Sequence, residues 1–438
     1  MKKLTLTVAI AMLLTVTQAT AQTDSTAKNT GPFNFTLEQC IEYAFSNSYS
    51  RKSIELSGES AEASYEQSKK SRLPNVSASA SESMTHTGTQ DNVNFSGNIG
   101  VSASVPIYDG GTIKHTIEQN RLQAEKTKVQ LTQADDNLTI QILQQFLTAL
   151  SAQERLKYQE AILATSREQM NRGEVQFRYG KIIESDYLML QAQYASDVAD
   201  SLNTAITLEN SLISLKKLMS MDAAAELSII YPSDNDIAQM ALLPEQNEAV
   251  DMAKDHMPDI ILAKANMEIA ETSIELAKTG KRPTVSASAG ISTGHSGFED
   301  MGEQFKNRFS QNIGINVGYT IFDRGSRNLQ ITKSKIQQQQ AQLDLQQAEL
   351  DVTQSVITQY RNVQLEYQRY LAYETKKDAY SKSFEAYQKK YEVGSIMAVE
   401  LLQQQNNYIS VLNSYINSKY GFILNRKILD VYTGQITE

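Results

Sequence analysis

The sequence contains no tryptophan, a single cysteine and only seven prolines among its 438 residues. Because a lone thiol has no partner within its own chain, Cys40 excludes an intrachain disulfide framework and a four-cysteine zinc site. Acidic residues outnumber basic ones by 50 to 41. This balance disfavours a dedicated nucleic-acid-binding protein, which needs basic surfaces to displace counterions from phosphate.

Long apolar runs are also missing, since no stretch of 18 or more apolar residues follows the N-terminus. The N-terminus itself begins Met-Lys-Lys, continues with an apolar run over residues 4–16 and has small residues at 19–21. That run is too short for a membrane-spanning helix, and the pattern is typical of a secretory signal peptide. We therefore expect residues 1–21 to be a signal peptide.

The prolines leave two long stretches untouched, one between Pro106 and Pro232 and one after Pro283. Within them, residues 112–172 and 326–393 contain no glycine either, which predicts two very long helices. About 61 residues at 1.5 Å each give a rod of roughly 90 Å. In the second stretch an apolar residue recurs every seven positions, which indicates coiled-coil packing: Leu329, Ile336, Leu343, Leu350 and Ile357.

The chain is a tandem duplication. Three pairs of segments mark the repeat: Pro74–Ala80 with Pro283–Ala289, Ile107–Gly111 with Ile321–Gly325, and Gly180 with Gly394. Register kept over such a distance predicts two copies of one structural unit. We expect the first unit over residues 22–224, a linker over 225–244 and the second unit over 245–438.

Within each unit the periodicity changes. Phe95 to Tyr108 and Phe309 to Phe322 alternate apolar and polar residues, which is typical of half-buried strands. Each unit is therefore expected to hold short helices, a β-hairpin and two long helices. The predicted bounds are 36–72, 76–84, 95–108, 112–172 and 182–219 in the first unit, and 245–280, 284–294, 309–322, 326–393 and 396–431 in the second.

Four strands cannot close a barrel, because membrane barrels need at least about eight. Open strand edges in lipid would leave backbone groups without hydrogen bonds. Three chains of four strands each would give twelve, with the long helices continuing as a hollow shaft. The sequence thus predicts a mainly α protein with a membrane β part. A filament without a pore is the alternative, but it leaves the hairpins and the duplication unexplained.

Several motifs occur together in a fixed order. They are Thr-Leu-Glu-Gln-Cys-Ile-Glu-Tyr-Ala at 36–44, Arg-Leu-Pro at 72–74, Ile-Tyr-Asp-Gly-Gly at 107–111, Ile-Phe-Asp-Arg-Gly at 321–325, and the glycine-centred segments 179–183 and 393–397. In these motifs and their spacing the sequence resembles the TolC-like outer-membrane efflux protein family, over essentially the whole chain after residue 21.

The resemblance implies a homotrimer in the lipid of the cell outer membrane, with a twelve-stranded barrel and a periplasmic α-helical barrel. It implies a passive exit duct of a tripartite efflux or type I secretion system. Its tip would dock on a periplasmic adaptor (membrane fusion) protein, linked to an inner-membrane transporter or secretion ATPase. A periplasmic adaptor itself is a weaker interpretation, since that class carries one helical hairpin and lipoyl-like β domains.

Gly180 and Gly394 interrupt the helices at equivalent positions, and we expect each at a sharp turn that needs a positive φ. A simple helix C-cap is the alternative interpretation. The resemblance adds that the two turns contact the adaptor. The contact residues it implies are Gly180, Lys181, Ile182, Ile183, Gly394, Ser395, Ile396 and Met397.

Six residues after each glycine comes an acid, Asp186 and Glu400. The resemblance implies that threefold symmetry gathers them into rings that narrow the entrance and attract cations; solvated helix-face acids are the alternative. Tyr391 matches a family position that constrains the closed tip. Ile396 and Gln403 replace a basic and an acidic residue of the family, so we expect apolar contacts and hydrogen bonds from 403–405 to close the gate.

Enzyme chemistry has little support. No phosphate-binding loop occurs, and the four histidines form no close pair or zinc motif. His86 and His295 occupy equivalent positions in the two expected hairpin loops, where a metal role is weighed against ordinary solvated histidines. We expect no catalytic residue, no bound metal and no cofactor, and any energy for transport must come from a partner.

Overall fold

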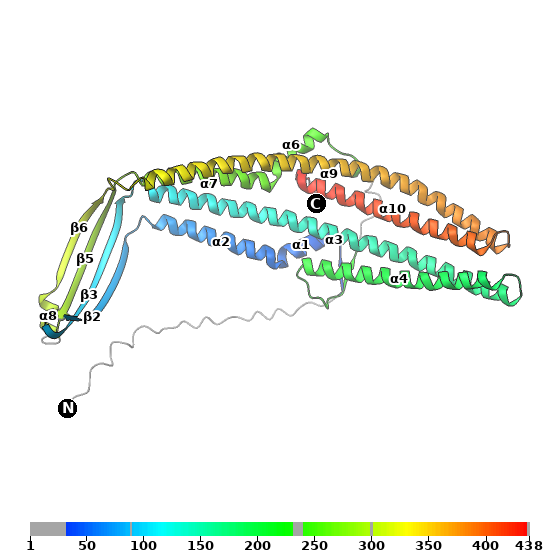
Figure 1. The fold of residues 1–438 in the computed structure, drawn as a ribbon, viewed down its shortest axis with the longest axis horizontal. Helices are drawn as coiled ribbons and strands as arrows, with labels where there is room; N and C mark the ends of the chain where they lie inside the picture. Colours follow the sequence, from blue (N-terminus) through cyan, green and yellow to red (C-terminus); the bar gives the residue numbers. More distant parts are fainter. Residues whose placement is uncertain (1–31, 88–89, 231–239, 298–300, 436–438) are drawn as a thin grey trace, which may run out of the picture.

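The computed structural model describes residues 32–87, 90–230, 240–297 and 301–435. The expected signal peptide and part of the expected linker over 225–244 lie outside these residues. Figure 1 shows an elongated molecule with a β-sheet at one end and a long helical shaft reaching to the other. The fold is the mainly α, tandem-duplicated architecture that the sequence predicts, with a β part confined to one end.

The two halves of the chain have matching elements. The first half contains β1 (Phe33–Phe35), α1 (Leu37–Asn47), α2 (Tyr49–Lys70), β2 (Asn75–Thr87), β3 (Gln90–Tyr108), α3 (Thr112–Arg178) and α4 (Glu184–Leu218). The second contains β4 (Leu227–Ile229), α6 (Gln246–His256), α7 (Pro258–Thr279), β5 (Thr284–Ser296), α8 (Met301–Asn307), β6 (Ser310–Gly318), α9 (Ser326–Glu392) and α10 (Ala398–Thr433). The short strands β1 and β4 pair in parallel and tie the start of the chain to the segment between the halves.

The expected helices over 36–72 and 245–280 are each divided in two. Ser48 has an extended backbone and its hydroxyl accepts the Arg51 N–H, so it ends α1 and caps α2. Met257 is likewise extended before Pro258, the first residue of α7. The breaks let each pair of short helices bend to follow the shaft.

The main sheet is antiparallel in the order β2-β3-β5-β6. The inner pair β3 and β5 joins the two halves of the chain, so the outer edges of β2 and β6 have no strand partner among the described residues. Apolar side chains project from the sheet into the surroundings of the protomer, including Ile99, Val101, Ile313, Ile315 and Val317. Such a sheet has both the open edges and the apolar face of a barrel segment.

The hairpins differ from the predicted bounds. In the first, β2 continues to Thr87 and β3 begins at Gln90, because main-chain pairing does not require the apolar alternation that stops near residue 95. In the second, the connection contains the short helix α8, and β6 ends at Gly318 instead of residue 322. The edge strand β6 pairs on one side only, so its last residues have less to hold them in register.

The duplicated Ile-Tyr-Asp-Gly-Gly motif forms the corner between sheet and shaft. Asp109 accepts hydrogen bonds from the backbone N–H groups of Gly111 and Ile113, and Asp323 does the same for Gly325 and Arg327. Gly111 and Gly325 both adopt left-handed backbone angles, with φ of 95° and 86°. The aspartate therefore caps the first turn of each long helix while the glycine turns the chain into it.

The shaft is built from α3 packed against α4 and α9 packed against α10, with α2 and α7 beside the sheet-proximal halves (Figure 1). Both α3 and α9 have 67 residues, which corresponds to about 100 Å. The prediction that the first long helix ends at Arg172 is wrong. The helix runs through Gly173 to Arg178. A Cβ at Gly173 would lie 2.5 Å from the Leu190 Cδ1 atom, so the glycine permits close packing of α4 and does not end the helix.

The main core lies in the middle of the shaft, where α3, α4, α9 and α10 meet α1 and α6. Cys40 is fully buried there, and burial raises the pKa of its thiol to about 12. Among the described residues, no helix has the length and apolar character that crossing a bilayer requires.

The heptad row of α9 lies partly outside this core. Ile357 packs against the core, whereas the four preceding members of the row are about half exposed on the protomer: Leu329, Ile336, Leu343 and Leu350. A regular apolar row on the surface of a long helix is a surface that coiled-coil packing would cover.

Candidate functional site

The tip of the shaft consists of two equivalent turns, one between α3 and α4 and one between α9 and α10. Gly180 and Gly394 have φ of 69° and 73°, and each lies in open space. The N–H of Lys181 donates to the Gln176 carbonyl and that of Ser395 to the Lys390 carbonyl, both at 2.9 Å. These bonds end each long helix in a left-handed cap, where a residue with a Cβ is strained.

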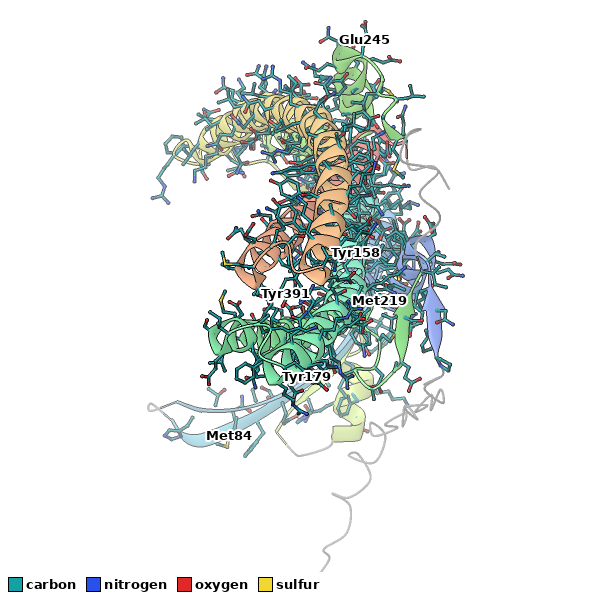
Figure 2. The ribbon with its side chains drawn as sticks, turned by 90° about the vertical axis from the view of Figure 1, so that its right-hand side faces the viewer. Met84, Tyr158, Tyr179, Met219, Glu245 and Tyr391 are labelled. Carbon is teal, nitrogen blue, oxygen red and sulfur yellow. The ribbon has the colours of Figure 1, made fainter. Side chains whose placement is uncertain are left out.

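Large apolar side chains are exposed at both turns. Tyr179 and Ile183 are 78% and 66% exposed at the first turn, and Val393 and Met397 are 76% and 60% exposed at the second. Figure 2 views the molecule from this end and shows Tyr179 at the first turn and Tyr391 on α9. The two turns thus form an exposed apolar surface (the tip surface, residues 179–183 and 393–397).

Asp186 and Glu400 lie in the first turns of α4 and α10. Their backbone N–H groups bond to the carbonyls of Ile183 and Met397, at 3.1 and 3.2 Å. Carboxylates there are stabilised by the helix dipole. Within the described part of the chain, neither side chain forms a hydrogen bond or an ion pair, so no basic side chain neutralises either charge.

Behind the turns lies a small apolar cluster made of Leu190, Phe384, Tyr391, Ala398, Leu401 and Leu402. Ile396 packs against it, so an apolar contact stands where the family carries a basic residue. The ring of Phe384 also stacks on Tyr408, with centroids 5.8 Å apart. Between α3 and α4, the rings of Phe177 and Tyr187 stack with their centroids 5.6 Å apart.

Tyr391 is buried, and its hydroxyl has no hydrogen-bond partner among the described residues. Burial, with a smaller contribution from the charge of Asp186, raises the pKa of this phenol. The side-chain amide of Gln169 on α3 is also buried and unpartnered in the described chain. Both residues line a cavity of about 490 Å³ between α3 and α9. The cavity is thus lined by one unpartnered polar group from the α3/α4 pair and one from the α9/α10 pair.

The burial of Gln169 was not predicted from the sequence, although the residue spacing around it indicates a buried helix face. Ile162, Ser166, Gln169 and Gly173 follow the three- and four-residue spacing of a buried helix face, and all four are buried. Polar residues on such a face need partners. Close by, Arg172 of α3 pairs with Glu392 of α9 at 2.7 Å, in a half-exposed ion pair between the helical pairs.

In the segment 403–405, which was expected to form hydrogen bonds at the gate, the two outer glutamines lie on different faces of α10. Gln403 is exposed, and among the described residues its side chain bonds to Asn407 of the same helix alone, at 3.3 Å. Gln405 is fully buried, and its amide donates to Ser166 of α3 and to Asp197 of α4. Gln405 therefore joins the two helical pairs, and Asp197 and Ser166 are partners that the sequence did not reveal.

The prediction that His86 and His295 lie in hairpin loops is wrong, because they lie in strands β2 and β5. His86 is exposed, whereas His295 is buried, with Nε2 3.0 Å from Glu82 and Nδ1 2.9 Å from the Gly297 carbonyl. In the described ranges no group of histidine, cysteine and acidic side chains is arranged to hold a metal ion.

Comparison with known proteins agrees with this architecture. Outer membrane protein TolC of Vibrio cholerae is 23% identical over 216 residues, which span about half of each chain (48% of this chain and 47% of the relative). The crystal structure of CusC superposes with a TM-score of 0.79 at 18% identity, covering 93% of this chain and 95% of CusC. The Campylobacter jejuni CmeC outer membrane channel superposes with a TM-score of 0.78 at 17% identity, covering 92% and 87%.

These structures show the fold, and the sequence profile shows the family. The profile described as "Outer membrane efflux protein" matches residues 41–220 and 249–435, which is most of the chain and includes both repeats. The chain belongs to the outer membrane efflux protein family.

Proposed function

We propose that this protein is the outer-membrane channel of a tripartite efflux or type I secretion system, a passive trimeric exit duct from the periplasm to the exterior. The observation that carries the proposal is the sheet with two open edges and an exposed apolar face, continued by a shaft of about 100 Å. Three copies would pair β6 of one chain with β2 of the next and close a barrel.

The exposed heptad row on α9 supports the same assembly. Leu329, Ile336, Leu343 and Leu350 need a partner surface along the shaft, and a neighbouring copy supplies one beside the closed barrel. A coiled-coil envelope protein without a pore is not favoured, because the family consists of efflux channels.

Purified protein reconstituted in planar bilayers tests the duct directly. We expect a stable trimer in outer-membrane fractions and single-channel conductance that prefers cations. A monomeric, secreted rod without conductance would contradict the proposal.

We propose further that Asp186 and Glu400 form the periplasmic gate together with Tyr391. Gln403, on the exposed side of α10, lies one turn after Glu400 and belongs to the same proposed gate. Uncompensated carboxylates at the narrow end favour cations. The variants Asp186→Asn and Glu400→Gln should reduce cation preference without loss of the trimer. Glu209→Gln, an exposed acid further along α4, is the control and should leave selectivity unchanged. Equal selectivity in all variants would contradict this gate.

The tip surface is proposed to contact a periplasmic adaptor that links the channel to an inner-membrane transporter or secretion ATPase. Its exposed apolar side chains and open turns support this assignment. Because Cys40 is buried with a raised pKa, its thiol gives a low background for labelling. Ser395→Cys should cross-link to the adaptor in cells, whereas Ser310→Cys on β6 should not. Cross-linking at neither or at both positions would contradict the assignment.

A further inference from the structure

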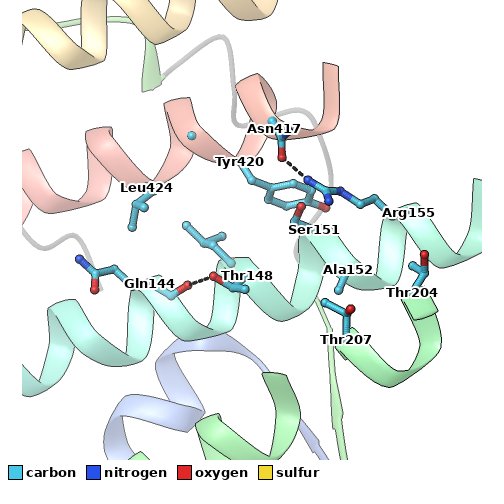
Figure 3. Close-up of a pocket in the computed structure, with 12 residues that line it drawn as sticks. Gln144, Thr148, Ser151, Ala152, Arg155, Thr204, Thr207, Asn417, Tyr420 and Leu424 are labelled. Carbon is cyan, nitrogen blue, oxygen red and sulfur yellow. Dashed lines mark hydrogen bonds between the residues drawn. The ribbon is translucent and has the colours of Figure 1, made fainter. Parts of the chain in front are cut away.

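A second cavity lies in the middle of the shaft, where α3, α4 and α10 meet (Figure 3). Its volume is about 290 Å³, and its lining includes Thr148, Ser151, Thr207, Asn417 and Arg155. Arg155 is the one charged residue among the lining residues, and no acid accompanies it. The rest of the lining is largely apolar and includes Leu147, Ala152 and Leu424, so Arg155 places a positive charge in a mostly apolar cavity.

The guanidinium of Arg155 is poorly compensated. One of its terminal nitrogens donates to the Asn417 Oδ1 atom, as Figure 3 shows. Its Nε is buried and has no hydrogen-bond partner among the described residues, and the residue forms no ion pair in that part of the chain. Burial lowers the pKa of Arg155, but a guanidinium remains protonated in proteins. The side chain as a whole is partly buried, and a partly desolvated cation without a counterion is less stable than a paired one.

The nearest acid in the sequence is already engaged. Glu154 pairs with Lys419 of α10 at 3.3 Å, and both side chains are largely buried. That ion pair compensates Lys419 and leaves none of its charge for Arg155, which projects from another face of α3.

The internal repeat supplies a matched comparison. Because α3 and α9 have the same length and an offset of 214, Arg155 corresponds to Arg369 and Ala152 to Glu366. In the second repeat Arg369 pairs with Glu366 at 2.7 Å. In the first repeat the alanine removes that carboxylate, and Ala152 lines the cavity instead.

The helix that faces this position also differs between the repeats, with the smaller residue in the second repeat. Gly421 of α10 lies beside Glu366, where a Cβ would be 3.4 Å from the carboxylate. Its counterpart on α4 is Thr207, which also lines the cavity and donates its hydroxyl to the Asn203 carbonyl at 2.8 Å. The threonine fills part of the space that Ala152 leaves but brings no negative charge.

We propose that the cavity at Arg155 binds a small oxyanion from solution, a carboxylate or inorganic phosphate, in place of the Glu366 carboxylate of the second repeat. Arginine binds such anions through paired N–H donors, and the second terminal nitrogen of Arg155 has no hydrogen bond in the described chain. Ser151, one helical turn before Arg155, has a hydroxyl without a hydrogen bond in the described chain, and the Asn417 amide offers its NH₂ group. Because these donors come from α3 and α10, the anion stabilises the junction between the two repeats.

The test uses the full-length trimer in detergent and inorganic phosphate as the probe, titrated at constant ionic strength with chloride as the balancing anion. Thermal unfolding is followed by circular dichroism. We expect a saturable rise in Tm of about 2 °C or more for the wild type. Phosphate also stabilises proteins non-specifically, so the difference between variants decides the result.

Arg155→Gln should lose the saturable part of the rise. The double variant Ala152→Glu with Thr207→Gly rebuilds the second repeat's arrangement and should also lose it while keeping the arginine, which guards against a folding defect in the first variant. Arg369→Gln is the matched control and should respond to phosphate as the wild type does. An equal phosphate response in wild type and Arg155→Gln would overturn the proposal. So would the absence of a response in wild type, as expected if a neighbouring chain's acid fills the cavity.

Discussion

The carboxylate of Asp197 on α4 accepts a 3.0 Å hydrogen bond from the side-chain amide of Gln405 on α10. Asp197 also accepts bonds from Gln193 at 2.9 Å and from the hydroxyl of Ser166 on α3. Asp197 is 1% exposed and forms no ion pair with any residue that the structure describes. This network joins the helical pair of the first repeat to that of the second, close to the tip end of the shaft.

The network predicts a pH dependence of stability. Burial is the main cause that raises the pKa of Asp197, and its three hydrogen bonds oppose the shift without cancelling it. A carboxyl whose pKa is higher in the folded state binds its proton more tightly there, so stability is greatest at low pH and falls as pH rises from the ordinary value toward the raised one. At neutral pH the buried charge therefore costs stability.

Asp197→Asn should remove that cost. The asparagine oxygen can still accept the bond from Gln193. With the Gln405 amide turned over, the asparagine NH₂ group can donate to the Gln405 Oε1 atom, which is buried without a partner among the described residues. We expect stability at neutral pH to rise by about 1 kcal/mol and the pH dependence in the mildly acidic range to weaken. Thermal unfolding at pH 5 and pH 7.5 measures both effects. Glu209→Gln, an exposed acid further along α4, is the control, and an equal change there would contradict the prediction.

Glycines in the helices predict opposite effects of alanine at two positions. A Cβ at Gly173 would lie 2.5 Å from Leu190 Cδ1, whereas at Gly58 in α2 its nearest neighbour would be Thr127 at 3.7 Å. Gly173→Ala should destabilise the protein by about 1–2 kcal/mol, since overpacking outweighs the gain in helix propensity. Gly58→Ala should stabilise it by about 0.5–1 kcal/mol. Denaturant unfolding compares them, and stabilisation by both would show that α4 yields freely at Leu190.

These two glycines illustrate what the sequence can predict. The long helices, the duplication and the overall architecture follow from residue periodicity and from the absence of proline, which act locally. A helical glycine is ambiguous, because it serves equally as a stop or as a point of close approach. Only the packing of α4 on α3 shows that Gly173 is the latter.

The site shows the same division. The left-handed turns at Gly180 and Gly394 were predictable because a positive φ is a property of one residue. The partners of Gln405 were not, since Ser166 and Asp197 lie 239 and 208 residues away and become neighbours only through helix packing. The roles of Asp186, Glu400 and the tip surface remain predictions, because they depend on the assembled trimer and its partners.

The tip turns predict a residue-specific tolerance. Gly394 has φ of 73° with no atom near its Cβ position, so a substitution there meets backbone strain alone. Gly394→Val should strain the turn by about 1–2 kcal/mol, whereas Gly394→Asn should be tolerated, because asparagine adopts left-handed angles more readily. Limited proteolysis at the tip measures the loosening. Equal cleavage of both variants would mean that the left-handed turn does not hold the tip together.

The exposed heptad row predicts where the protomers hold one another. Leu343 and Leu350 are 64% and 50% exposed on one chain, and covering the exposed part of each leucine should contribute about 1 kcal/mol or slightly more, which is roughly half the value for a full burial. The double variant Leu343→Gln with Leu350→Gln should therefore lower the temperature at which the trimer dissociates, while the fold of the protomer persists because neither side chain belongs to its core. Asp344→Ala, an exposed position about 100° around the helix from Leu343, is the control. Trimer bands on semi-native gels at increasing temperature report the result, and an unchanged dissociation temperature in the double variant would mean that another face of the shaft forms the contact.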